Sequence, residues 1–328
     1  MTLKKIDKGI FVDAPKISSV GKVDGIIFDC DGVLIDVTNS YDLAIKKTVD
    51  FIINKMASLN EQNIVTTKMI DGFKASGGFN DEVDVTYALI LSTVAARKLN
   101  KSFSEFVNEV ISKSDQTGIK SVEHFLDSLK VDLSDIRNKL VYPGKRFENP
   151  LSSIFDEMFY GAELYTKLYN KKPNFFNRKG LIENDKMLID KNLLDELHKK
   201  FKNNISIVTG RGLISASHSL KDLFQEFNIK NSKFLEDEPR EMAKPNPQSL
   251  ISSIRGMGTT CTIFVGDSTE DFLMAHETAK KGISVIFCGV YGTSKDPASK
   301  MALFQEKGAD IVVESVTLIP KTLNLVGI

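Results

Sequence analysis

Two aspartates, Asp29 and Asp31, follow a short apolar run in the segment GIIFDCDGVLID at residues 25–36. The apolar run predicts a buried strand, and carboxylates at the end of such a strand are costly to desolvate. In doubly wound sheets, ligands bind beyond the carboxyl ends of the strands. The spacing therefore indicates chemistry performed by a pair of carboxylates at the edge of a sheet.

Polar side chains also follow three later predicted strands. These strands cover residues 205–208 (ISIV), 233–235 (KFL) and 262–265 (TIFV). The residues that come after them are Thr209, Gly210 and Arg211, then Lys244 in AKPNP, and then Asp267 and Asp271 in GDSTED. Because strand ends meet at one edge of a parallel sheet, we expect all of these side chains to converge.

The convergence predicts a metal site and a nucleophile. Four clustered carboxylates repel one another, and a divalent cation together with Lys244 is the simplest way to neutralise them. Oxygen ligands favour Mg²⁺, which is commonly shared with a substrate phosphate. A carboxylate beside such a phosphate can form an aspartyl-phosphate, which is an established form of covalent catalysis.

The elements that must position these residues alternate between strand and helix. A further apolar run at 283–287 and a weaker one at 310–313 read as strands, while 213–227 and 271–279 have helical spacing. Strands that are apolar throughout are typical of a parallel sheet covered by helices on both faces. We therefore expect an α/β fold with a doubly wound, Rossmann-like parallel sheet.

One long interval, 37–185, lacks buried strands and predicts helices near 41–52, 85–99, 103–111 and 151–169. Ser102 and Glu105 fit a capping box ahead of the third of these. The sequence thus predicts a core domain from residues 1–36 and 186–328, with a mostly α-helical domain at 37–185 inserted into it. Within the insertion, the Gly77-Gly78 pair predicts a flexible loop, and a role for Asn80 or Asp81 in contacting substrate stays open.

Composition sets the remaining bounds. The chain of 328 residues carries 43 Lys and Arg against 43 Asp and Glu, so charge gives no argument for nucleic acid or an anionic membrane as partner. Its 3 cysteines form neither a disulfide framework nor a metal pattern, which fits a reducing compartment. No signal peptide and no apolar run of about 20 residues is evident, so we expect a cytoplasmic protein of open oligomeric state.

The four segments FDCDGVLID, IVTGR, AKPNP and FVGDSTEDF resemble the ordered motifs of the haloacid dehalogenase (HAD) superfamily of phosphohydrolases. The resemblance covers the expected core, and the insertion resembles that superfamily's helical cap in position. Within the cap, DVTNSYDLAI, SGGFNDEVDVTYALI and GLIEN are similar to a largely archaeal and bacterial group of phosphatase-like members of subfamily IA. This finer resemblance names no substrate.

The resemblance implies a role for each motif residue. Asp29 matches the nucleophile, and Asp31 matches the general acid and base. Lys244 would offset charge on the nucleophile and the transferred group. The implied catalytic set is Asp29, Asp31, Thr209 and Lys244; the substrate-binding set is Thr209, Gly210, Arg211 and Lys244; the Mg²⁺ set is Asp29, Asp31 through its backbone carbonyl, Asp267 and Asp271. For Arg211, a surface or helix-start role competes with substrate contact.

The acid at position 31 also separates functions within the superfamily. Dehalogenases lack an acid at this place, and the ion-pumping ATPases have threonine there. Asp31 therefore favours a phosphatase for a small organic phosphate, or a sugar-phosphate phosphomutase with the same motifs. A third hypothesis is a non-catalytic binding or regulatory protein, supported only by the long insertion and the N-terminal extension at 1–23.

Overall fold

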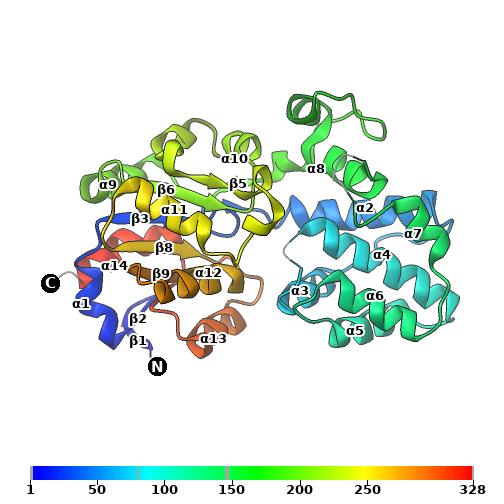
Figure 1. The fold of residues 1–328 in the computed structure, drawn as a ribbon, viewed down its shortest axis with the longest axis horizontal. Coiled ribbons are helices and arrows are strands. Elements are labelled where there is room, and N and C mark those ends of the chain that lie inside the picture. The colour runs from blue at the N-terminus through cyan, green and yellow to red at the C-terminus, as the bar shows by residue number, and fades with distance from the viewer. Residues whose placement is uncertain (1–2, 80, 145–147, 327–328) are drawn as a thin grey trace. The chain divides into compact units, whose positions relative to one another are not determined.

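The computed structural model describes residues 3–79, 81–144 and 148–326, and the chain divides into two compact units (Figure 1). Unit 1 consists of Met1–Asp36 with Lys186–Ile328, and unit 2 is Val37–Asp185. The chain leaves unit 1 after β4 (Ile35–Asp36) and returns to it at β5 (Lys186–Met187). These two strands pair antiparallel, so the outgoing and returning segments are hydrogen-bonded to each other.

Unit 1 is built on an eight-stranded sheet in the order β1-β2-β10-β9-β8-β3-β6-β7. Its strands are β1 (Leu3–Asp7), β2 (Ile10–Asp13), β3 (Gly25–Phe28), β6 (Ile205–Thr209), β7 (Lys233–Phe234), β8 (Thr262–Gly266), β9 (Val285–Val290) and β10 (Ile311–Val313). From β10 to β7 all neighbours are parallel. The predicted α/β class with a largely parallel sheet is confirmed, and β3 lies in the middle of it.

The N-terminal segment is a part of this sheet that the sequence did not reveal. Strands β1 and β2 form an antiparallel hairpin, and β2 pairs antiparallel with β10. The turn between them contains Gly9 at φ 70°, a conformation that favours glycine. Ile10 and Val12 are fully buried. The hairpin therefore extends the sheet, which gives the N-terminal extension a structural role.

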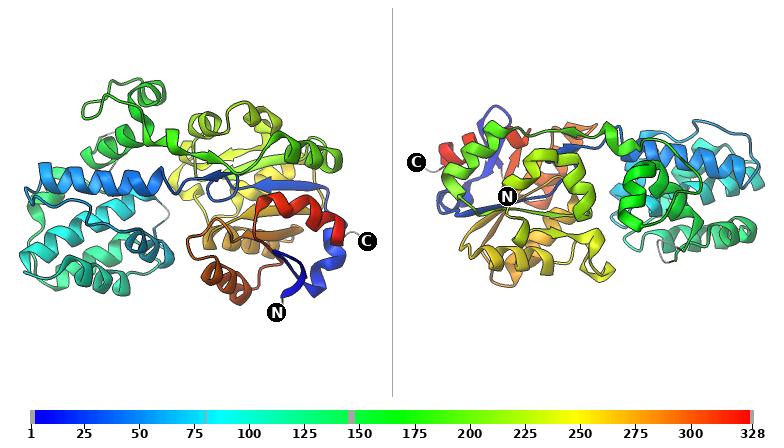
Figure 2. Two further views of the ribbon diagram at one scale, coloured as in Figure 1. Left: turned by 180° about the vertical axis from the view of Figure 1, so that it is seen from behind. Right: turned by 90° about the horizontal axis from the view of Figure 1, so that it is seen from above.

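Helices cover both faces of the sheet (Figure 2). They are α1 (Ile17–Val20), α9 (Lys191–Phe201), α10 (Leu213–Leu220), α11 (Gln248–Met257), α12 (Thr269–Lys280), α13 (Pro297–Lys307) and α14 (Ile319–Val326). Helix α14 contacts α1 and α9, while α11 contacts α12 against the other face. Ile27, Val208, Phe264 and Phe287 of the sheet form one buried cluster with residues of α11, α12 and α13.

Short 3₁₀ segments connect these elements. They are Ala14–Lys16, Lys221–Glu226, Ile229–Asn231, Leu235–Asp237, Arg240–Met242 and Val316–Leu318. The helix predicted at 213–227 is wrong in its second half, because α10 ends at Leu220 and a 3₁₀ segment follows. Lys221 adopts φ 50°, which is incompatible with a continuing α-helix.

Unit 2 is helical. Its elements are α2 (Tyr41–Lys55), α3 (Thr67–Ala75), α4 (Glu82–Lys98), α5 (Phe103–Lys113), α6 (Ile119–Ser128), α7 (Ser134–Leu140), α8 (Pro150–Tyr169) and the 3₁₀ segment Leu181–Asn184. Helix α4 contacts α2, α3, α5, α6 and α8, and all its residues from 83 to 96 are buried. This central place leaves α4 without an exposed face between residues 83 and 96, so its polar residues Asp84, Thr86, Ser92 and Thr93 are buried along with the apolar ones. No helix within the described ranges has the length and apolar content needed to cross a membrane.

Several local predictions in unit 2 have a direct outcome. Ser102 is the N-cap of α5, but its side chain makes no capping hydrogen bond, so the predicted capping box is wrong. Asp81 caps α4 by accepting from the Val83 amide at 2.9 Å, while Asn80 lies outside the described residues. Helix α8 contains a kink. Gly161 adopts φ 72° there, and a Cβ at this position would lie 2.1 Å from the Gly180 nitrogen.

Candidate active site

The loop after β3 is a tight turn that presents Asp29 and Asp31. The carbonyl oxygen of Cys30 accepts hydrogen bonds from the amides of Val33, Leu34 and Ile35 at 2.8–3.2 Å. Gly32 adopts φ 73°, and a Cβ at this position would lie 2.4 Å from Oδ2 of Asp267. Glycine therefore lets the chain turn and also lets the Asp267 carboxylate approach the backbone.

Lys244 joins two of the predicted acids. Its Nζ lies 2.7 Å from Oδ1 of Asp29 and 2.6 Å from Oδ1 of Asp271, and all three side chains are largely buried. Burial raises the pKa of Asp29 to about 8, and Lys244 opposes that rise. Burial also disfavours charge on Lys244, but Asp271 and Asp29 outweigh it and raise the pKa of the ammonium group. The lysine thus stays charged between two carboxylates.

Asp271 both caps helix α12 and contributes a carboxylate oxygen to the candidate site. With Ser268 it forms the capping box of α12, and its Oδ2 accepts from the amides of Asp267 and Ser268 and from the Ser268 hydroxyl. Its other oxygen contacts Lys244. A Cβ at position 266 would lie 2.4 Å from Cβ of Asp271, so Gly266 makes room for the carboxylate at the end of β8.

Three carboxylates fit the requirements of a divalent cation. Ligand oxygens of Asp29, Asp267 and Asp271 all lie within 4.8 Å of one another. Hard carboxylate oxygens grouped in this way suit Mg²⁺, which also accepts water ligands to complete its shell. The side chain of Asp31 is not part of the group; its backbone carbonyl was the expected ligand, and that role stays a prediction.

The side chain of Asp31 binds Arg211. Nε of Arg211 lies 2.5 Å from Oδ1 of Asp31, and Nη1 donates to Oγ of Ser219 at 2.8 Å. The arginine side chain is 0% exposed, whereas that of Asp31 is 30% exposed. The surface interpretation of Arg211 is therefore wrong, because the opposite charge of Asp31 compensates its burial. Gly212 occupies the N-cap of α10, so the helix-start role also falls to another residue.

Thr209 and Gly210 lie at the end of β6. Thr209 is fully buried, and its Oγ1 accepts a hydrogen bond from the Arg211 amide at 3.3 Å. Gly210 is exposed, and a Cβ on it would have no atom within 4 Å. The Cα of Gly210 thus borders open space at the end of β6. The phosphate-binding roles expected for these two residues stay predictions.

A family model described as "Hydrolase: haloacid dehalogenase-like hydrolase" matches residues 23–277, which is most of the chain. The chain belongs to this family. The match spans both the strand ends that carry the acids and the whole of unit 2. The resemblance inferred from the four motifs is therefore confirmed at the level of the family.

Two solved structures share the fold. Phosphatase Tt82 from Thermococcus thioreducens is 23% identical with a TM-score of 0.57, covering 86% of this chain and 99% of that one. A structural-genomics protein is 17% identical with a TM-score of 0.59, covering 92% of this chain and 98% of its own. At these identities the likeness shows the fold alone.

One curated relative is longer than this HAD-like chain. It is named imidazoleglycerol-phosphate dehydratase, from Phytophthora nicotianae, and is 26% identical over 147 residues. The match covers 42% of this chain and 31% of the relative. This chain thus matches only about a third of the length of that protein.

Two residues that lie at the site, Thr293 and Lys300, were not predicted from the sequence. Thr293 Oγ1 donates to the carbonyl of Gly32 at 2.7 Å, and Lys300 Nζ contacts the carbonyl oxygen of Asp267 and, at 3.2 Å, its Oδ2. Both residues follow β9, the fifth parallel strand to contribute to this edge. The rule applied to the other strand ends would have indicated them, since the run at 283–287 was recognised as a strand.

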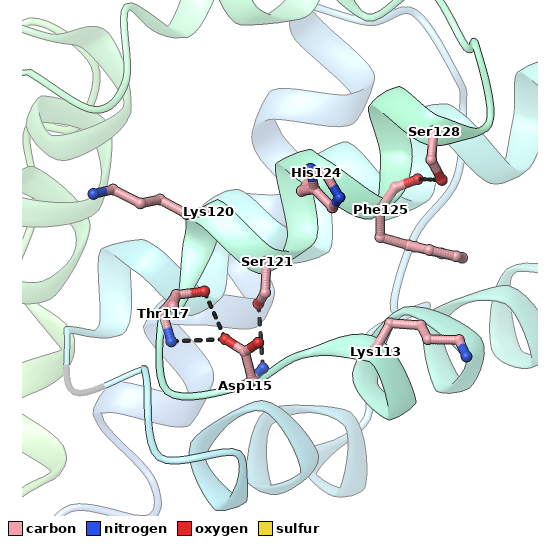
Figure 3. Close-up of a pocket in the computed structure, with 8 residues that line it drawn as sticks. All are labelled: Lys113, Asp115, Thr117, Lys120, Ser121, His124, Phe125 and Ser128. Carbon is pink, nitrogen blue, oxygen red and sulfur yellow. Dashed lines mark hydrogen bonds between the residues drawn. The ribbon is translucent and has the colours of Figure 1, made fainter.

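A separate hollow of about 520 Å³ lies in unit 2 between α5 and α6 (Figure 3). Three of the residues that line it bond to one another: Asp115 accepts from the amide and hydroxyl of Thr117, and the Ser121 hydroxyl accepts from the Asp115 amide. These bonds shape the connection between two helices. None of the predicted site residues lines this hollow.

Proposed function

We propose that this chain is a Mg²⁺-dependent phosphatase that hydrolyses a small organic phosphomonoester through an aspartyl-phosphate on Asp29. The observation that supports this most is the buried arrangement of Asp29, Lys244 and Asp271, with Asp31 two residues away. It supplies a nucleophile, a fixed positive charge and an acid in one place. Membership in a hydrolase family agrees with this chemistry.

The residues divide the reaction between them. Asp29 attacks phosphorus, the bond from phosphorus to the ester oxygen breaks, and Asp31 gives its proton to that departing oxygen. Asp31 then takes a proton from a water molecule, which attacks the phosphorus and releases inorganic phosphate and free Asp29. Lys244 offsets the negative charge on Asp29 and the phosphoryl group. The Thr209 hydroxyl and the Gly210 amide hold phosphoryl oxygens.

The residues that would hold Mg²⁺ are Asp29, Asp267 and Asp271, with the backbone carbonyl of Asp31. When bound, the ion supplies positive charge that draws the substrate phosphate toward Asp29 and balances the carboxylates.

Phosphate release from para-nitrophenyl phosphate and from a panel of metabolite phosphates tests the proposal. Activity should require Mg²⁺, disappear with EDTA, and fall to background in Asp29→Asn. Asp222→Asn, which changes an exposed aspartate of unit 1, is the matched control and should keep full activity. Turnover that persists without any divalent metal would contradict the proposed function.

A sugar-phosphate phosphomutase uses the same residues and is the second candidate, motivated by the same pair of aspartates. Adding a hexose 1-phosphate with a catalytic amount of the bisphosphate should then yield isomer faster than free phosphate. Release of phosphate alone across the sugar phosphates excludes it. A panel that gives no turnover from folded, Mg²⁺-supplied protein would favour the non-catalytic alternative.

A further inference from the structure

The guanidinium of Arg211 is fixed at two points behind Asp31. Nε donates to Oδ1 of Asp31 and Nη1 donates to Oγ of Ser219, which is itself buried. Bonds from two different nitrogens set both the place and the rotation of a planar group. The charge of Arg211 is therefore directed at one particular oxygen of Asp31.

Burial separates Arg211 from anything that enters the site. Its side chain is fully covered, whereas Asp31 keeps an exposed face. In this arrangement a ligand at the strand ends meets Asp31, and Arg211 lies behind Asp31 with its Nε on Oδ1. A buried ion pair generally returns little net stability, because desolvating both charges offsets their attraction. Stability alone therefore gives a poor account of this arginine.

We propose that Arg211 is a positioning residue that orients Asp31 for proton transfer, an inference that rests on the proposed phosphatase function. With Oδ1 held by the guanidinium, the other carboxylate oxygen is the one that carries the proton. A protonated carboxyl group still has an oxygen that accepts hydrogen bonds, so the contact with Nε is compatible with both protonation states. Asp31 thus keeps one orientation through both half-reactions.

This proposal replaces the expected direct contact between Arg211 and substrate, and a double-mutant cycle separates the two. Arg211→Met should lower kcat by about 10- to 100-fold with little change in KM, because a misplaced catalytic group costs rate. In an Asp31→Asn background the same substitution should cost less than about threefold, since the group it positions is already gone. Losses that multiply in the double variant would overturn the positioning role.

The leaving group gives a second readout that a purely structural role would not move. Arg211→Met should lose more activity toward an alkyl phosphate such as glycerol phosphate than in the single-turnover release of nitrophenol from para-nitrophenyl phosphate, whose leaving group needs little protonation. Arg211→Lys should not restore the alkyl phosphatase activity. A guanidinium donates to Asp31 and Ser219 from two nitrogens of one planar group, and an ammonium group has a single nitrogen. Equal losses toward both substrates would contradict the proposal.

Controls keep the outcomes distinct. Arg255→Met removes an exposed arginine of α11 and should leave both activities unchanged. If the Arg211 variants do not fold, Ser219→Ala leaves the arginine in place and should still shift the ratio between the two substrates in the same direction by about threefold, the effect of losing one hydrogen bond. If the wild-type protein releases no nitrophenol in that single turnover, the proposed function and this role are refuted together. If the wild type releases it and the variants keep the wild-type ratio between the two substrates, this role alone is refuted.

Discussion

Asp29 and Asp31 are two residues apart, yet their surroundings suit different tasks. Asp29 is buried and lies against Lys244, so its charge is balanced where a nucleophile must approach phosphorus. Asp31 is partly exposed and held by Arg211, which leaves it able to exchange protons with substrate and water. Different neighbours thus assign different chemistry to two identical side chains, a common device in sites with paired carboxylates.

Substitution of each aspartate should therefore give a different kinetic result. Asp29→Asn removes the covalent route and should abolish activity. Asp31→Asn should keep phosphate binding but slow turnover by about 10²–10⁴-fold, the usual contribution of acid–base catalysis. With para-nitrophenyl phosphate, rapid mixing of Asp31→Asn should show one equivalent of nitrophenol followed by slow turnover. A similar burst from Asp29→Asn would mean that the two roles are assigned wrongly.

The raised pKa of Asp29 predicts a dependence of stability on pH in the metal-free protein. Burial lifts this pKa from 3.8 to about 8, so the unfolded chain ionises first as the pH rises. Stability that is present below the unfolded pKa is then lost progressively as the pH passes through the folded pKa. Asp29→Asn removes this loss. Measured with EDTA at pH 8, its Tm should exceed that of the wild type by roughly 2–6 °C.

The same pair of proteins supplies the control for that measurement. Near pH 3 the difference in Tm between the wild type and Asp29→Asn should shrink toward zero, because Asp29 is then largely protonated in both the folded and the unfolded chain. A difference that does not change between about pH 3 and pH 8 would show that Asp29 does not titrate in this range in the folded protein.

Residue types and strand ends were enough to predict that Asp29, Lys244, Asp267 and Asp271 approach one another. The convergence follows from the parallel sheet, in which strand ends share an edge. The contact between Arg211 and Asp31 was not predictable in this way. The contact depends on the direction of the Arg211 side chain after β6 and on its hydrogen bond to Ser219 in the following helix, α10. Neither feature can be read from the spacing of apolar residues.

At the scale of elements, the segment from β9 to α13 adds a cation to the site. Lys300 lies in the first turn of α13 and contacts the backbone and the carboxylate of Asp267. Together with Lys244 and Arg211 it places three cations among the four carboxylates of the strand ends. Lys300 therefore repels any metal ion bound by Asp267.

Removal of this charge should tighten metal binding. Lys300→Met is expected to lower the Kd for Mg²⁺ by about tenfold, as the loss of one nearby like charge predicts. Titration calorimetry with Mg²⁺ and no substrate measures the effect directly. Lys307→Met removes the same charge from the exposed end of α13 and should change the Kd little. Weaker binding in Lys300→Met would instead mean that the lysine holds Asp267 in its binding position.

The elements that the sequence predicted wrongly or missed have two physical causes. The strands β1 and β2 are short and rich in charge at the start, so they carry little of the apolar signal that marked the central strands. β2 pairs with β10, a contact between the two ends of the chain, and β1 pairs with β2. The helix at 213–227 had the right apolar spacing, but periodicity does not reveal a residue such as Lys221 that leaves the helical region.

At the scale of the whole molecule, the chain passes between the two units twice. Within each unit, the outgoing and the returning segments are hydrogen-bonded to each other. In unit 1, β4 pairs with β5. In unit 2, the Ser40 hydroxyl donates to Asp185 at 2.5 Å, and the Asn184 side chain donates to the carbonyl of Asn39. Each unit is thus closed by its own hydrogen bonds, which favours separate local opening of the two.

The proposed metal ligands all belong to unit 1, and this predicts where Mg²⁺ stabilises the chain. A ligand slows only those opening reactions that break its site. Hydrogen exchange with Mg²⁺ and no substrate should therefore show added protection in the turn after β3 and at the start of α12. The amides of α4 in unit 2 should exchange at the same rate with or without the metal. Asp267→Asn should abolish the gain in unit 1, whereas an equal gain in α4 would show that the two units open together.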